Sequence, residues 1–76
     1  MEVSTILLLQ IKEGRNKGGV TLQINDWDVS GGLDKEALQE QAIQATLNTR
    51  EYRTLGYARE HVEVKGFFVT TRFHQL

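Results

Sequence analysis

The chain has 76 residues, no cysteine and a nearly balanced charge, with nine Lys and Arg against ten Asp and Glu. A chain of this length forms a single domain, here residues 1–76, and such a domain buries only about 60% of the surface that its unfolded chain exposes. The absence of cysteine excludes disulfides and thiolate metal sites, and the charge balance lacks the strongly basic character of dedicated nucleic-acid-binding proteins.

The N-terminal segment alternates in hydropathy and predicts a β-strand. Its odd-numbered positions, which we assign to the core face, are Val3, Thr5, Leu7, Leu9 and Ile11. A polar, glycine-rich stretch at 13–19 follows, and then a second alternating run contains Val20, Leu22 and Ile24. Two alternating runs joined by such a stretch indicate a β-hairpin.

A single long helix is predicted from about Asp34 to Leu55. Asp34 is a good N-cap residue, and Gly56 suits the left-handed position that ends a helix. The stripe expected to pack on the sheet holds Leu38, Ala42, Ala45, Thr49 and Tyr52. An alternative remains open at Asn48-Thr49, where Asn48 and Glu51 would instead cap a second helix.

The last predicted strand, near Glu60 to His74, changes parity at Gly66. A bulge there would direct one set of side chains inward: Val62, Val64, Phe67, Val69, Thr71 and Phe73. A turn at Lys65-Gly66 is the alternative. The elements together predict an α+β fold, in which a small antiparallel sheet of about three strands in ββαβ order carries one long helix on one face.

Several large apolar residues fall outside the expected core. Ile6, Leu8 and Phe68 would lie on the open side of the sheet, and Ile43 and Leu47 on the outer side of the helix. One small core cannot bury all of these side chains, so we expect these five residues to form a protein interface. The expected partner is a second copy, giving a homodimer, or another protein.

Binding of nucleic acid is the alternative function. A discontinuous basic surface would consist of Arg15, Lys17, Arg50, Arg53, Arg59, Lys65 and Arg72. Tyr57 and Phe68 could add stacking aromatic rings. The acids Glu51, Glu60 and Glu63 interrupt this set.

No arrangement of residues in the sequence indicates catalysis. His61 and His74 are too far apart along one strand to share a metal, and Asp26 and Asp28 are typical of a turn. We therefore expect a non-enzymatic protein without metal, cofactor, small-molecule substrate or membrane segment, in a reducing cytoplasm. Accessory or regulatory proteins of phages and mobile elements often have this size and lack of motifs, and we expect a role of that kind.

Overall fold

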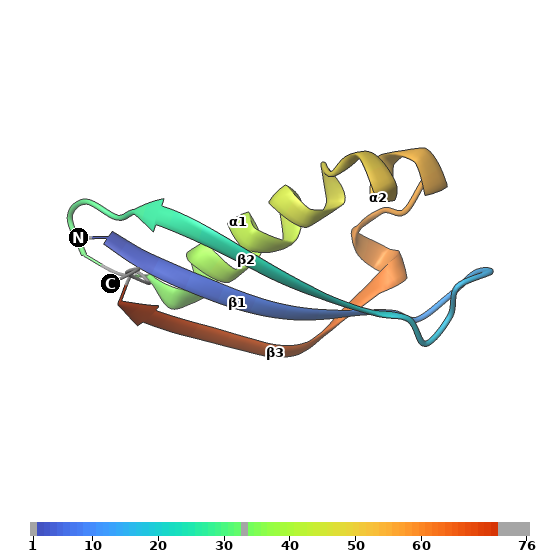
Figure 1. The fold of residues 1–76 in the computed structure, drawn as a ribbon, viewed down its shortest axis with the longest axis horizontal. Helices are drawn as coiled ribbons and strands as arrows, with labels where there is room; N and C mark the ends of the chain where they lie inside the picture. Colours follow the sequence, from blue (N-terminus) through green and yellow to red (C-terminus); the bar gives the residue numbers. More distant parts are fainter. Residues whose placement is uncertain (1, 33, 72–76) are drawn as a thin grey trace, which may run out of the picture.

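The hairpin, the helical region and the last strand all form, and the α+β fold is confirmed. The computed structural model describes residues 2–32 and 34–71. In chain order it contains β1 (Glu2–Ile11), β2 (Val20–Asp28), α1 (Lys35–Leu47), α2 (Arg50–Leu55), the 3₁₀ turn η1 (Arg59–His61) and β3 (Val62–Thr71). The three strands form one antiparallel sheet in the order β2-β1-β3 (Figure 1).

The loop between β1 and β2 sets the register of the hairpin. Ile11 N donates to Gly19 O at 2.9 Å, and Gly18 N donates to Ile11 O at 2.7 Å. Gly18 has a φ of 93°, a region that residues with a Cβ rarely adopt. The loop length places even-numbered residues opposite even-numbered residues, for example Ile6 opposite Ile24.

A β-bulge in β3 explains the change of parity, as predicted. Leu8 pairs with Gly66, whereas Leu9 pairs with Val64, so Lys65 is the additional residue. Phe67 is consequently buried and Phe68 is exposed. The predicted continuation of this strand through Phe73 to His74 lies outside the described residues.

The helical region consists of two helices rather than the single long helix of the prediction. The alternative with a second helix after Asn48-Thr49 is therefore correct. Asp34 caps α1, with its carboxylate accepting from Ala37 N at 3.2 Å. The helix ends because Thr49 has extended backbone geometry and its hydroxyl donates to Thr46 O at 2.7 Å. Thr49, not Asn48, is the N-cap position of α2, and Gly56 ends α2 in the left-handed conformation.

The buried face of α1 differs from the predicted stripe. Leu38, Ala42, Ile43, Thr46 and Leu47 are buried. Ile43 and Leu47 therefore belong to the core, and their assignment to a protein interface was wrong. The prediction treated residues 34–55 as one helix, and including Thr49 and Tyr52 in its stripe rotated the expected face away from Ile43 and Leu47.

The core lies between α1 and one face of the sheet. It is formed by Val3, Leu7, Leu9, Leu38, Ala42, Ile43, Leu47, Tyr52, Val62 and Phe67. The helix α1 packs mainly on the central strand β1. Among the described residues no helix covers the opposite face of the sheet, and none of the described helices has the length and apolar character needed to span a membrane.

Candidate interaction surface

The sheet face opposite α1, here called the open face, carries most of the exposed large apolar side chains. Even-numbered residues of β1 and β2 lie on it because the odd-numbered residues of β1 fill the core. Six apolar side chains share this face: Ile6, Leu8, Val20, Leu22, Ile24 and Phe68. They form the apolar patch of the open face.

The strand register places these side chains next to each other. Ile6 lies between Ile24 on β2 and Phe68 on β3, and the adjacent row places Leu22 opposite Leu8. Directly opposed residues of an antiparallel pair have Cβ atoms about 4.5–5.5 Å apart, which is within contact distance for such side chains. The patch therefore crosses all three strands without a polar gap in its two central rows.

Gly66 completes the second row without a side chain of its own. A Cβ at this position would lie 3.2 Å from Leu8 Cδ1 and 3.2 Å from Phe68 Cε2. These two side chains thus lean over the Gly66 backbone from either side. The glycine lets the apolar surface continue smoothly onto β3 at the bulge.

The patch is exposed most strongly on its outer strands. Leu22, Ile24 and Phe68 are 57%, 52% and 56% exposed, while Ile6 and Leu8 on the central strand are half-buried by their neighbours. A group of adjacent apolar side chains this exposed is uncommon on small monomers and marks an interaction site more often than scattered single residues do.

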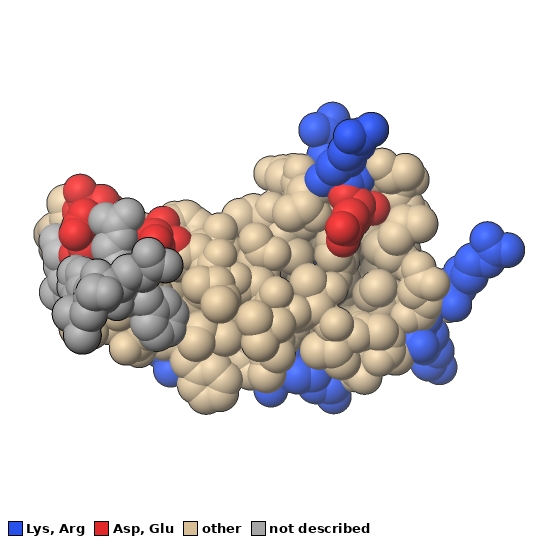
Figure 2. Space-filling view, in the orientation of Figure 1, with Lys and Arg blue, Asp and Glu red and all other residues tan. Residues whose placement is uncertain are grey.

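Charged residues bound the patch at its two ends. Glu2, Asp26 and Asp28 lie at one end of the sheet, where β1 begins and β2 ends. Lys12 and the loop bases Arg15 and Lys17 follow at the other end. Figure 2 shows Asp and Glu at the first end and Lys and Arg at the loop end, with further Lys and Arg over α2 and along the lower edge and a smaller acidic group beside α2.

Three of the five predicted interface residues meet on one face. Ile6, Leu8 and Phe68 are adjacent there, whereas Ile43 and Leu47 are in the core. Sequence reasoning did not include Val20, Leu22 and Ile24 in the interface. The signal that could have found them is the hairpin register, because a loop that pairs even with even positions puts them beside Ile6 and Leu8.

Polar residues occupy the inner face of β2 and explain why its apolar residues point outward. Trp27 Nε1 donates to Thr5 Oγ1 at 2.8 Å, and the hydroxyls of Thr21 and Tyr52 are 2.6 Å apart. These hydrogen bonds satisfy polar atoms on the helix side of the sheet. If β2 were rotated so that its other face met the core, its apolar residues would be buried but both hydrogen bonds would be lost.

The basic residues of the nucleic-acid alternative do not share one surface. Arg50 and Arg53 lie on α2, on the helix side of the sheet, whereas Lys65 lies on β3 and pairs with Glu63 at 3.4 Å. Arg59 pairs with Glu40 at 3.2 Å. Arg15 and Lys17 are exposed in the loop. Arg72 lies outside the described residues.

The predicted stacking residues are also separated. Phe68 lies on the open face, whereas Tyr57 packs against Tyr52, with ring centroids 5.7 Å apart, and against His61. Tyr57 is therefore part of the packing beneath α2.

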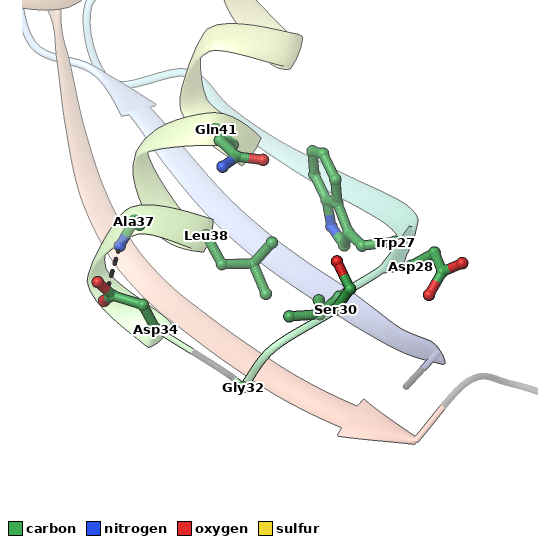
Figure 3. A pocket seen from close by; sticks show the side chains of 9 residues that line it. Trp27, Asp28, Ser30, Gly32, Asp34, Ala37, Leu38 and Gln41 are labelled. Carbon is green, nitrogen blue, oxygen red and sulfur yellow. Dashed lines mark hydrogen bonds between the residues drawn. The ribbon is translucent and has the colours of Figure 1, made fainter.

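A depression of about 290 Å³ lies between the end of β2 and the start of α1. Figure 3 shows Trp27 and Leu38 on its walls and Asp34 bonded to Ala37 N. The Asp34 carboxylate caps the helix, and the Trp27 indole N–H already has Thr5 as acceptor. Among the described residues that line this depression there is no Lys, Arg or His, so these residues offer no cation to an anionic ligand.

A second depression of about 410 Å³ lies where the β1–β2 loop meets the end of α2, and His61 lines it. His61 Nδ1 accepts from Ala58 N at 2.9 Å, so this ring stabilises the backbone of η1. His74, the other histidine, lies outside the described residues. Within residues 2–32 and 34–71, no three His, Asp or Glu side chains are grouped as metal ligands.

Comparison with known proteins gives no relative from which a function could be transferred. No protein-family model, curated protein or solved structure matches this chain.

Proposed function

We propose that this chain is a non-catalytic protein-interaction domain that forms a homodimer through its open sheet face. The observation that carries the proposal is the apolar patch, whose six side chains lie in adjacent positions on a face that no described helix covers. A domain of 76 residues has a small core, and a second subunit is a common source of additional stability at this size.

The size of the sheet agrees with a small dimer interface. Ten-residue strands span about 33 Å, and three strands are about 14 Å wide, so each copy offers about 450 Å² of plan area. Two copies together bury about 900 Å², slightly less than the roughly 1,000 Å² expected of a stable specific interface, which is the range of weak, reversible contacts.

The energetics favour a reversible dimer. Full burial of a large apolar side chain contributes about 1.5–3 kcal/mol, and these side chains are already about half buried. Twelve of them across two copies would contribute on the order of 10 kcal/mol, which is comparable to the cost of about 4–15 kcal/mol for association. The most favourable balance of these figures is about 6 kcal/mol, so we expect a weak dimer with a dissociation constant of roughly tens of micromolar or above.

Sedimentation equilibrium from low to high micromolar protein tests the proposal. The mass should rise from that of one chain toward that of two, and Leu22→Lys should hold it at one chain because a buried lysine would lose its hydration. The matched control is Leu55→Lys, since Leu55 is also 57% exposed but lies on α2. Circular dichroism confirms that both variants fold.

Two results would contradict the proposal. A wild-type mass of one chain over the whole concentration range would reject the homodimer. Equal dissociation by Leu22→Lys and Leu55→Lys would reject the open face as its interface, because added charge at either place would then have the same effect.

We place the protein in the cytoplasm as part of the same proposal. The support is the cysteine-free sequence, which is compatible with a reducing compartment and needs no oxidative folding.

Binding of nucleic acid is the second candidate, favoured by one observation. Arg50 and Arg53 are one turn apart on α2 and line the same shallow surface together with Thr54. Such a pair could contact successive phosphates. A mobility-shift assay with single- and double-stranded nucleic acid should then show binding that weakens steeply with salt and is lost in an Arg50→Gln, Arg53→Gln variant. No shift at low salt would reject this function.

A further inference from the structure

We propose that the outer edge of β2 is a second association surface, to which β2 of another copy adds antiparallel. The product is one continuous sheet with the three strands of each copy. Pairing along this edge leaves the open face free, so it does not depend on the open-face homodimer. Two features support it: the direction of the main-chain groups of β2 and the symmetry of its sequence.

Hydrogen bonds at the end of β1 show which main-chain groups face which neighbour. Ile11 N donates to Gly19 O on the β2 side, whereas Lys12 N donates to His61 O on the β3 side. Main-chain groups alternate in direction along a strand, so odd-numbered residues of β1 bond to β2 and even-numbered residues to β3. The strands β1 and β2 pair odd with odd and even with even positions. The even-numbered residues of β2 therefore direct their N–H and C=O groups away from β1.

Val20, Leu22 and Ile24 supply the outward main-chain groups in the first part of β2. This strand lies at the edge of the sheet, and within residues 2–32 and 34–71 no strand pairs with its outer side (Figure 1). The backbone hydrogen bonds that these ranges make in turns and loops do not use the three residues either. Unpaired main-chain groups in a row are a template for another strand.

The two edge strands of the sheet differ in their ability to accept another strand. On β3 the bulge inserts Lys65, whose side chain pairs with Glu63. Bulges and lysines on an edge strand both prevent extension of a sheet. Residues 20–25 of β2 contain no bulge, proline, glycine or charged residue. We therefore expect extension at β2 and not at β3.

The sequence of β2 identifies a second copy of the same strand as the occupant. A two-fold axis at Leu22 pairs this residue with Leu22 of the partner subunit and Val20 with the partner's Ile24. Hydrogen-bonded pairs then use all the outward groups of these residues, and apolar side chains lie opposite each other. Moving the axis by one residue in one direction places Val20 opposite the partner's Asp26. Moving it in the other direction places Ile24 opposite the partner's Gly18, and Gly18 N–H already bonds within the hairpin loop.

Edge pairing joins the apolar patches of two copies into one surface. The axis is perpendicular to the sheet, so both open faces lie on one side and both helical layers on the other. Each copy contributes only the flanks of three apolar side chains, so we expect pairing at near-millimolar protein, above the range of the open-face dimer. Both interfaces together give four chains, in which two extended sheets stack on their open faces.

Disulfide formation by single-cysteine variants tests the register. The chain has no natural cysteine, and Val20 and Leu22 are equally exposed at 57%. Leu22→Cys and the matched control Val20→Cys both carry Phe68→Lys as well. This change prevents stacking through the open face, and it lies on β3, away from the outer edge of β2. Each protein is oxidised mildly at near-millimolar concentration, and mass spectrometry follows the linked fraction.

We expect Leu22→Cys to form the linked dimer at least about tenfold faster than Val20→Cys. The two Leu22 positions face each other with Cα atoms about 5.5 Å apart, which a disulfide can span. The two Val20 positions are four residues apart along the strands, about 13 Å. Equal rates, or a faster reaction of Val20→Cys, would overturn this pairing, because random collision does not favour one of two equally exposed positions.

Amide hydrogen exchange is a second readout that leaves β2 unchanged. In Phe68→Lys, the amides of Leu22 and Ile24 should exchange at least about fivefold more slowly at near-millimolar than at low micromolar protein, because pairing gives them acceptors. The Thr21 amide points toward β1 and serves as the control, which should not change. Equal exchange of Leu22 and Ile24 at both concentrations would overturn edge pairing.

Failure of the open-face homodimer gives a different result. The wild type and Phe68→Lys would then have the same mass at every concentration. Failure of edge pairing alone would leave the mass of the wild type rising to that of two chains, with no slowing of the outward amides of β2.

Discussion

Tyr52 connects α2 to the sheet. Its side chain is buried, its ring packs near that of Tyr57, and its hydroxyl is 2.6 Å from the Thr21 hydroxyl on β2. The helix α2 has only six residues and no side-chain hydrogen bond at its N-cap, so its own backbone gives it little stability. Tyr52 is the one residue of α2 that is buried, so its side chain is the main contact of this helix with the core.

A double-mutant cycle measures that connection. Tyr52→Phe and Thr21→Val should each lower the free energy of unfolding by about 1 kcal/mol, because each leaves the other hydroxyl without its partner. The double variant should lose little more than either single variant. Urea denaturation at a fixed protein concentration provides the measurement, and strictly additive losses would show that the hydroxyl pair contributes nothing.

The large apolar residues of α1 lie in the core, whereas those of β2 at even-numbered positions lie on the surface. Ile43 on α1 is fully buried, whereas Ile24 on β2 is 52% exposed. The same residue type therefore has two different roles in two elements. Ile43 contributes to the stability of the monomer, and Ile24 contributes to the apolar patch.

Alanine substitutions should separate these roles. Ile43→Ala should lower the free energy of unfolding by about 2–5 kcal/mol through loss of burial and formation of a cavity. If that variant does not fold, Ile43→Val should lower it by about 0.5–1.5 kcal/mol. Ile24→Ala should leave the unfolding of the monomer nearly unchanged and weaken dimerisation. Denaturation of dilute protein, combined with sedimentation, tests both, and the reverse pattern would contradict the assignment of the two faces.

The whole molecule is thin because it has only two layers. Its dimensions are 38 × 28 × 20 Å and its radius of gyration is 13.2 Å, compared with about 11 Å expected for a compact domain of this length. One side of the sheet packs on α1, and among residues 2–32 and 34–71 no helix lies on the other side (Figure 1). A second copy on the open face would change this flat shape into a four-layer sandwich.

The melting temperature should therefore depend on protein concentration. Native chains associate with each other, whereas unfolded chains do not. Mass action therefore raises the melting temperature as the protein concentration rises above the dissociation constant. We expect an increase of several degrees for the wild type from low micromolar to near-millimolar protein, and none for Leu22→Lys. Differential scanning fluorimetry at several concentrations checks this, and an equally large increase in both proteins would contradict a dimer through the open face.

The sequence by itself determined the features that depend on neighbouring residues. Alternation defined the strands, the parity change defined the bulge next to Gly66, and Asp34 and Gly56 defined the outer ends of the helical region. Three residues of the open face, Ile6, Leu8 and Phe68, followed from the same local alternation.

The tertiary structure decided which side of each element is inside. Alternation divides β2 into two faces but does not say which one meets the core, and the pairing of Ile24 with Ile6 depends on the loop between their strands. Likewise, Ile43 and Leu47 are buried on α1, whereas Tyr52, which the predicted stripe placed on the same helix, lies on the separate helix α2. Both outcomes depend on contacts between residues distant in the chain, and the local pattern of apolar residues carries no information about such contacts.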